Sequence, residues 1–288
     1  MGVWARSRQI TRMCFNVIRA DKEMLLFPLL AGVFSIAFSA AMLFPTIIVH
    51  ILRQEHVAFA PLQIAVTFLT YLGLAFFATF FNVCVVYTTK VRLEGGDATF
   101  GQSIGFAFSR IHLILAWSLV AATVGMILRA LDGVARRSGG LGKILLAILR
   151  ALLGAAWSLI TIFVVPGMVY EGLGPFAAIK RSIETLRATW GESLVRYFGL
   201  GLVQFVLVLP AILLGVALFP AMAYGLPVVI GLVLLGLLVL YIMAIVLVFN
   251  VANTVFNTAL YVYAGSRRAP PGFEMDVLQG AFHQKGSF

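Results

Sequence analysis

Six long apolar blocks dominate this sequence and limit what it can fold into. A helix needs about 20 apolar residues to cross the roughly 30 Å hydrocarbon core of a bilayer. Each block meets that length, and the blocks are apolar throughout rather than at every third or fourth residue, so their surface suits lipid or another helix. The predicted spans are residues 24–49, 62–88, 111–131, 144–170, 194–220 and 227–263.

The composition excludes an ordinary water-soluble domain. The chain of 288 residues is 61% hydrophobic and 11% charged, whereas globular domains have about 45–50% apolar and about 25% charged residues. A soluble fold of this length cannot bury so much apolar surface. We therefore predict an all-α fold, a polytopic transmembrane helix bundle, with a single membrane domain over 1–268 and a cytoplasmic tail over 269–288.

The distribution of basic residues predicts the orientation, because cytoplasmic connections carry an excess of lysine and arginine. With the N-terminus inside, fifteen of the 21 Lys and Arg residues are cytoplasmic, and both termini are predicted to be cytoplasmic. The net charge of +10 suits anionic headgroups better than nucleic acid, because no basic run is interleaved with aromatic residues on a soluble face. The predicted outer-side residues are Arg53, Arg129, Arg136, Arg137, Lys143 and Arg150.

A short basic segment precedes the first, third and fifth spans, at residues 10–19, 100–110 and 175–187. Each has apolar residues at helical spacing and ends on arginine, which is typical of a helix in the headgroup layer. The chain is thus predicted to form three hairpins, each preceded by a basic interfacial helix. Unrelated multi-span proteins also carry basic amphipathic stretches at this boundary, so true repetition stays open. The apolar stripe of the third segment consists of Phe176, Ile179, Ile183 and Leu186.

Basic side chains of these segments are the candidate contacts for anionic lipid headgroups. Membrane lipids are therefore the predicted partners, and a homo-oligomer or a membrane partner protein stays open, while nucleic acid is not expected. The candidate headgroup residues are Arg19, Arg110, Lys180, Arg181 and Arg187.

Amide side chains form a second candidate site. Asn250, Asn253 and Asn257 share one face of the sixth span, Asn82 lies in the second span, and Gln204 lies in the fifth. Two interpretations stay open. These amides line a polar path or bind a headgroup, or they form hydrogen bonds between helices, each worth roughly 0.6–2 kcal/mol in membranes.

Catalytic and metal sites are not predicted. The four histidines are scattered without metal-ligand spacing, and the sequence has no glycine-rich phosphate loop and no nucleophile elbow. The two cysteines, Cys14 and Cys84, resemble small hydrophobes. We therefore predict a protein without cofactor, metal or catalytic residues. Pro166 and Gly167 are a candidate hinge, because prolines within spans kink or break helices.

The tail opens with a helix-breaking linker and then places apolar residues at helical periodicity. This amphipathic segment is predicted to dock on the cytoplasmic face of the protein itself, with a regulatory contact to a partner as the alternative. Its apolar residues are Phe273, Val277, Leu278 and Phe282.

Several stretches resemble an uncharacterised family of prokaryotic six-span membrane proteins, known only as a domain of unknown function. The resemblance covers nearly the whole chain and implies a prokaryotic cytoplasmic (inner) membrane, but no site residues. The triple hairpin is also remotely similar to the membrane domain that accompanies some bacterial glycerophosphodiester phosphodiesterases, whose catalytic barrel this chain lacks. The stretches are 19–28, 80–82, 154–158, 164–166, 180–182, 189–192 and 280–282.

The function predicted from these patterns is non-enzymatic. We expect a lipid-interacting or membrane-organising subunit that uses its basic interfacial helices to hold anionic headgroups. The alternative is a channel or passive transporter with an asparagine-lined path, and the third possibility is an enzyme at the membrane interface.

Overall fold

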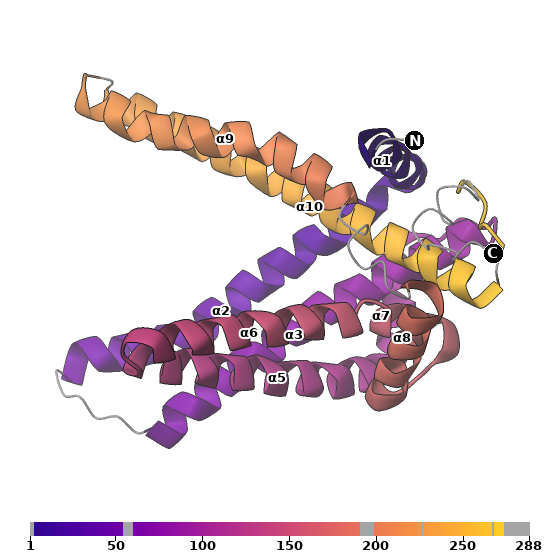
Figure 1. The fold of residues 1–288 in the computed structure, drawn as a ribbon, viewed down its shortest axis with the longest axis horizontal. Coiled ribbons are helices and arrows are strands. Elements are labelled where there is room, and N and C mark those ends of the chain that lie inside the picture. The colour runs from indigo at the N-terminus through magenta and orange to yellow at the C-terminus, as the bar shows by residue number, and fades with distance from the viewer. Residues whose placement is uncertain (1–2, 54–59, 191–198, 226, 267, 274–288) are drawn as a thin grey trace.

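The computed structural model describes residues 3–53, 60–190, 199–225, 227–266 and 268–273, and all regular structure within them is helical. The predicted all-α fold class is therefore confirmed (Figure 1). In chain order the helices are α1 (Val3–Ala20), the 3-10 helix η1 (Lys22–Leu25), α2 (Leu26–Arg53), α3 (Ala60–Leu93), α4 (Phe100–Ser109), α5 (Ile111–Arg137), α6 (Gly140–Ile160), α7 (Val164–Glu171), α8 (Pro175–Trp190), α9 (Gly199–Ala223) and α10 (Val228–Ser266).

Six apolar stretches within the described helices are long enough to cross a bilayer, as the sequence predicts. One stretch lies in each of α2, α3, α5, α9 and α10, and the remaining stretch runs from α6 through α7. The first residues of the span predicted at 194–220 lie outside the described residues. Helices α3 and α10 have 34 and 39 residues, or about 51 and 58 Å at 1.5 Å per residue. Both are therefore longer than the hydrocarbon core is thick.

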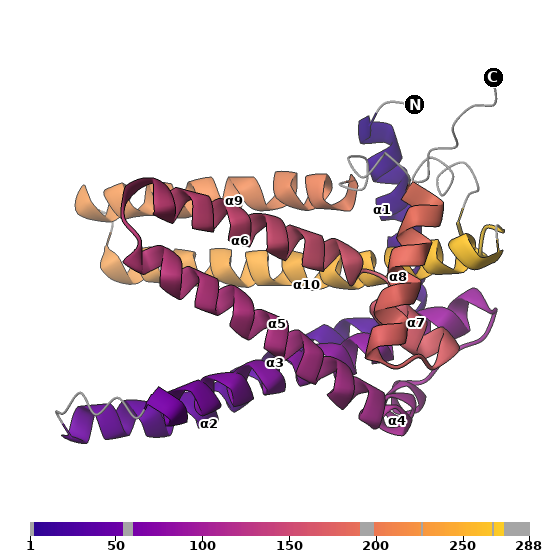
Figure 2. The same cartoon turned by 60° about the horizontal axis from the view of Figure 1, so that its bottom comes forward.

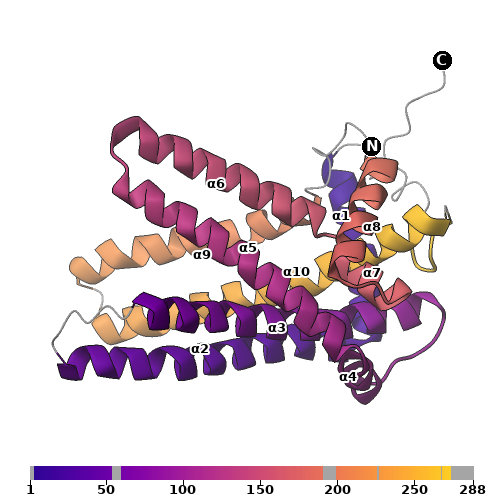
Figure 3. The ribbon, with the colours of Figure 1, turned by 90° about the horizontal axis from the view of Figure 1, so that it is seen from below.

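The apolar helices pair as antiparallel hairpins, α2 with α3, α5 with α6, and α9 with α10, and a shorter helix precedes each pair. Figures 2 and 3 show that the hairpins meet at one end and diverge toward their tips. We call the shared end the convergent end. It holds α1, α4, α7, α8 and the C-terminal parts of α3 and α10. The order of short helix and hairpin thus occurs three times in the described chain.

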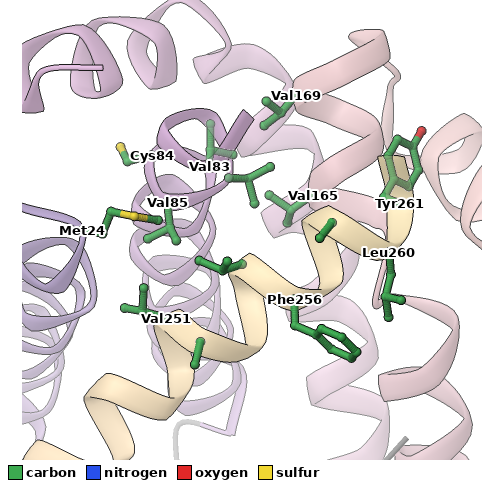
Figure 4. Close-up of a cluster of buried hydrophobic side chains, with 14 of the residues drawn as sticks. Met24, Val83, Cys84, Val85, Val165, Val169, Val251, Phe256, Leu260 and Tyr261 are labelled. Atoms are coloured by element: carbon green, nitrogen blue, oxygen red, sulfur yellow. The ribbon is translucent and has the colours of Figure 1, made fainter. Parts of the chain in front are cut away.

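The hydrophobic core lies at the convergent end rather than along the spans. Residues 83–86 of α3 are almost fully buried, and the cluster around them combines side chains of α3, α7 and α10 (Figure 4). In contrast, only 6% of the most apolar window of α9, and 6% of that of α10, is buried. Apolar side chains gain little from leaving lipid for another helix, so the spans need not pack along their length.

A break between α6 and α7 divides the segment predicted as one span over 144–170. Pro166 explains its position, because a proline inside a helix clashes with the carbonyl four residues earlier, here that of Ile162. After the break Pro166 stands in the first turn of α7, where a missing N–H costs little. The freed N–H of Phe163 donates to the buried hydroxyl of Ser182 in α8 at 3.2 Å.

The turn between α3 and α4 has clear local causes. Gly95 adopts a left-handed conformation with φ of 85°, which suits glycine and ends α3. Thr99 then caps α4: its hydroxyl accepts from the N–H of Gln102 at 3.3 Å, and the Gln102 side chain accepts from the N–H of Thr99 at 3.0 Å. This reciprocal capping box fixes the start of α4.

Packing within the first hairpin depends on Gly73 of α3. A Cβ at this position would lie 2.0 Å from a ring carbon of Phe38 in α2. We expect Gly73→Ala to lower the free energy of unfolding by about 1–3 kcal/mol, because the ring must move within a packed helix pair. Thermal or denaturant unfolding of the purified protein in detergent measures the change.

Gly32→Ala is the matched control on α2, where an added Cβ meets nothing within 4 Å. This variant should be neutral or more stable by up to about 1 kcal/mol, because alanine favours helix more than glycine does. Equal destabilisation by the two substitutions would contradict the close approach of α2 and α3.

Candidate functional site

The elements that carry the predicted headgroup residues all lie at the convergent end (Figure 2). Arg19 is in the last turn of α1, Arg110 joins α4 to α5, and the remaining three are on α8. The fold thus brings residues from three distant segments to one end of the molecule. Their environments differ, because Arg19, Lys180 and Arg187 are exposed whereas Arg110 and Arg181 are half-buried.

Helix α1 presents a stripe of arginines on the face that points away from the protein. Arg8, Arg12 and Arg19 are exposed and follow the spacing i, i+4, i+11, which places them on one face. The opposite face packs near α9 and α10, so the apolar side of α1 is used within the protein. Its buried residues are Ile10, Met13, Cys14, Val17 and Ile18.

Helix α8 faces the protein with small and polar residues, which differs from the expectation of one apolar stripe in the headgroup layer. Its buried residues are Ala178, Ser182 and Thr185. Ile179 and Leu186 of the predicted stripe pack against the core, whereas Phe176 is 77% exposed. The helix therefore presents Phe176 outward, on the same face as Lys180 and Arg187.

Arg181 is held by partners within the protein. Its Nε donates to Oε1 of Glu171 at 3.0 Å, and the hydroxyl of Tyr261 donates to the same oxygen. The pKa of Arg181 is raised, first by the hydrogen bond between its side chain and that of Tyr261 and second by the bond to Glu171. The guanidinium therefore stays charged. These contacts join α7, α8 and α10. Arg181 therefore ties three helices together, a role that the sequence does not reveal.

Arg110 packs against the end of α7. Its guanidinium carbon lies 5.7 Å from the ring centroid of Phe106. Gly172 ends α7 with φ of 65°, and a Cβ there would lie 2.9 Å from Nη1 of Arg110. Glycine at position 172 thus supplies both the left-handed turn and the space for the guanidinium. A cation near the C-terminus of a helix is also favoured by the helix dipole.

An ion-pair network that sequence reasoning missed connects the first hairpin to α4. Arg92 of α3 donates through Nε to Asp21 at 2.6 Å and through Nη2 to both Asp21 and Asp97. The side chain of Asp21 is only 6% exposed. Glu23 in η1 accepts a hydrogen bond from the N–H of Phe100 at 2.8 Å, where the positive end of the α4 dipole favours a carboxylate. The sequence places these charges at span ends but does not show their pairing.

A lysine and a tyrosine meet at the same end. Nζ of Lys90 lies 4.9 Å from the ring centroid of Tyr170, a distance typical of a cation–π contact. The hydroxyl of Tyr170 is buried and has no hydrogen-bond partner in the part of the chain that the structure describes. The ring therefore contributes packing and a cation–π contact, while its hydroxyl contributes no hydrogen bond to stability.

The candidate amides are not in one common environment. Asn82 of α3 accepts a hydrogen bond from the hydroxyl of Thr254 in α10 at 3.2 Å. This contact favours the interhelical role for Asn82, and a polar path stays a prediction. Asn250 is exposed, and the half-buried amides are Asn253, Asn257 and Gln204.

The candidate hinge lies in α7, which is buried from Val164 to Val169. A Cβ at Gly167 would lie 3.6 Å from the Tyr261 hydroxyl and 3.9 Å from Cβ of Ala178. Gly167 thus sits where α7 meets α8 and α10. A hinge function of Pro166 and Gly167 stays a prediction.

The structure also locates possible metal ligands and the two cysteines. Within the described ranges, no three His, Cys, Asp or Glu side chains lie close enough together to hold a metal ion. Cys14 and Cys84 are free and buried. Burial raises the pKa of the Cys14 thiol, which favours its protonated form.

The start of the predicted tail packs onto the protein. The N–H of Phe273 donates to the carbonyl of Pro270 at 3.1 Å, and the Phe273 side chain belongs to the buried core. The rest of the predicted amphipathic segment, residues 274–288, lies outside the described residues.

These features define a multi-pass α-helical membrane protein whose described short helices gather at one end of its apolar hairpins. The chain belongs to a family of unknown function, DUF6159, whose family model matches residues 61–271. The match runs from the start of α3 past the end of α10. It confirms the predicted resemblance to an uncharacterised family over these residues, whereas the predicted matching stretches 19–28 and 280–282 lie outside them. The similarity to the phosphodiesterase-associated membrane domain stays a prediction. No curated protein matches the chain, and no solved structure does.

The buried ion pair makes a prediction about stability. Asp21→Asn should lower the free energy of unfolding by about 2 kcal/mol or more, because it leaves part of the Arg92 charge uncompensated at a buried contact. Asp97→Asn removes the exposed partner of the same guanidinium, since Asp97 is 79% exposed, and should cost less than about 1 kcal/mol. Unfolding in detergent compares the two variants, and equal costs would argue against a buried tie at Asp21.

The two tyrosines provide a second matched pair. Tyr261→Phe removes a hydroxyl that donates to Glu171 and should cost about 1–3 kcal/mol. Tyr170→Phe removes a buried hydroxyl that has no partner among the described residues, so this variant should be neutral or slightly stabilising. Midpoints of thermal unfolding decide between them. A larger loss for Tyr170→Phe would mean that its hydroxyl binds a partner such as a buried water.

Proposed function

We propose that this protein binds anionic lipid headgroups at its convergent end and organises the surrounding membrane without catalysing a reaction. The observation that carries the proposal is the pair of exposed basic faces on α1 and α8. The opposite face of each helix packs on the protein, so the position of each basic face relative to the hairpins is set.

The exposed face of α8 has the chemistry of an interfacial helix. Phe176 supplies an apolar side chain for the boundary between headgroups and acyl chains, and Lys180 and Arg187 lie beside it on the same face. Helices of this type bind by burying apolar area and by attracting anionic headgroups. Each Lys or Arg near an anionic membrane surface contributes about 1 kcal/mol.

The charges on these faces are available to a ligand. Ion pairs between described residues use Arg92, Arg150 and Arg181, and the exposed basic residues of α1 and α8 are in none of them. The stripe of Arg8, Arg12 and Arg19 adds three cations at the same end of the molecule. A phosphate-bearing headgroup suits such a surface because guanidinium groups bind phosphate through paired hydrogen bonds.

The proposed orientation follows from the same charges. The convergent end faces the cytoplasm of a prokaryotic cell, and the hairpins cross its inner membrane, with both termini cytoplasmic. The excess of lysine and arginine on cytoplasmic segments supports this arrangement.

The test replaces two exposed charges and keeps the structural one. The variant K180Q/R187Q leaves Arg181 in place, because Arg181 holds α7 and α10. Native mass spectrometry of protein released from nanodiscs of phosphatidylglycerol and phosphatidylcholine measures the lipids that remain bound. Loss of two charges, each contributing about 1 kcal/mol, should reduce the enrichment of phosphatidylglycerol roughly thirtyfold.

Glu184→Gln is the matched control, because it removes an exposed negative charge from the same helix. This variant should keep or increase the enrichment of phosphatidylglycerol. Unchanged enrichment in K180Q/R187Q, with an unfolding midpoint like that of the wild type, would contradict headgroup binding by α8.

A further inference from the structure

The tip of the α5–α6 hairpin, residues 129–150, carries a second basic cluster at the opposite end of the molecule from α1, α4 and α8 (Figure 2). Its basic residues are all exposed, and the acidic residue of the segment is Asp132. These charges oppose the rule that places basic residues on the cytoplasmic side, so they call for another explanation. The basic residues are Arg129, Arg136, Arg137, Lys143 and Arg150.

Helix lengths place this tip at the far surface of the bilayer. Helix α5 has 27 residues, about 40 Å at 1.5 Å per residue, and it starts at the convergent end. A hydrocarbon core of roughly 30 Å that begins at Ile111 ends near residue 131. The last turns of α5 and the first of α6 then lie in the headgroup layer of the opposite leaflet.

Arg150 lies deeper than the rest of the cluster. It follows the start of α6 by ten residues, about 15 Å along the helix. Its Nε pairs with Asp132 of α5 at 2.8 Å, and Asp132 lies close to the end of α5. The guanidinium is thus held by a carboxylate near the far surface, as expected of an arginine whose backbone lies in the hydrocarbon region. This pair neutralises the charge of Arg150 within the hairpin. Lys143 is exposed and is in none of the ion pairs between described residues.

A shallow, open groove lies on the exposed side of α6 beside this tip, and all of its lining residues belong to this one helix. Small residues form its floor, because Gly140, Ala147 and Ala151 lie on one helical face, and Ile144 and Ile148 lie beside them. The remaining lining residue is Lys143, in the first turn of α6. The groove is therefore apolar where it enters the hydrocarbon region and cationic where it reaches the headgroup layer.

We propose that this groove binds one acyl chain of an anionic phospholipid in the leaflet opposite the convergent end, with the lipid phosphate on Lys143. The phospholipid matches the groove in polarity and in charge. Its apolar acyl chain lies over the small residues, and its anionic phosphate contacts the lysine. The inference does not depend on the headgroup site of α1 and α8, because the two lie at opposite ends of the spans.

A lipid suits this groove better than a second copy of the chain. Copies inserted in the same orientation would bring one basic tip against another, and like charges that face each other oppose association. An anionic headgroup instead compensates the cluster of Arg129, Arg136, Arg137 and Lys143.

The test fills the groove without removing charge. In A147L/A151L, two leucines occupy the floor of the groove, and leucine is compatible with a lipid-facing helix. Native mass spectrometry of the protein, titrated in detergent with phosphatidylglycerol, should show the loss of one bound lipid relative to the wild type. Ala156→Leu is the matched control, because Ala156 is exposed on α6 outside the groove, and it should bind like the wild type.

Two further results complete the test. Lys143→Gln should weaken the same lipid roughly threefold, the effect of one exposed ion pair. The variant K180Q/R187Q should retain this lipid, which separates the groove from the α8 site. An unchanged number of bound lipids in A147L/A151L would overturn the proposal. A lower oligomeric state in that variant than in the wild type would also overturn it, because it would identify a second copy as the occupant.

Discussion

Packing around the last turns of α3 holds the structure together. Residues 83–86 are buried by α7 and α10 at the convergent end, while the spans beyond this point bury little of their surface. The reason is the solvent. In lipid an apolar side chain needs no partner, so close packing is required only where polar backbone ends, charged side chains and water come together. Tertiary order is therefore concentrated at one end of the hairpins.

Polar contacts at this end connect the three hairpins to one another and to the short helices. The pair of Asp21 and Arg92 joins the start of the first hairpin to its end, and Asp97 extends it toward α4. Glu171, Arg181 and Tyr261 join the second hairpin to the third. Because half-buried charges lose hydration, these groups are compensated by one another, and that requirement orients the helices that carry them.

The two proposed lipid sites lie where exposed cations form no ion pair with another described residue. At the convergent end, Lys180 and Arg187 point away from the core because the opposite side of α8 is occupied by packing. At the far tip, Lys143 stands at the end of an apolar groove. In both places an apolar surface adjoins a cation, and this is the arrangement that an anionic phospholipid matches.

The sequence by itself determined the helical class, the six apolar spans and the order of short helix and hairpin, because span length and composition follow directly from bilayer thickness. It also marked Pro166 as a site where a helix kinks or breaks, although not the partner Ser182, whose hydroxyl accepts the freed N–H of Phe163. Only the tertiary structure decided which charges are free. Arg181 and Arg187 look alike in sequence, yet one meets Glu171 and Tyr261 and the other is exposed. That difference depends on contacts between residues far apart in the chain, and helical periodicity alone does not encode them.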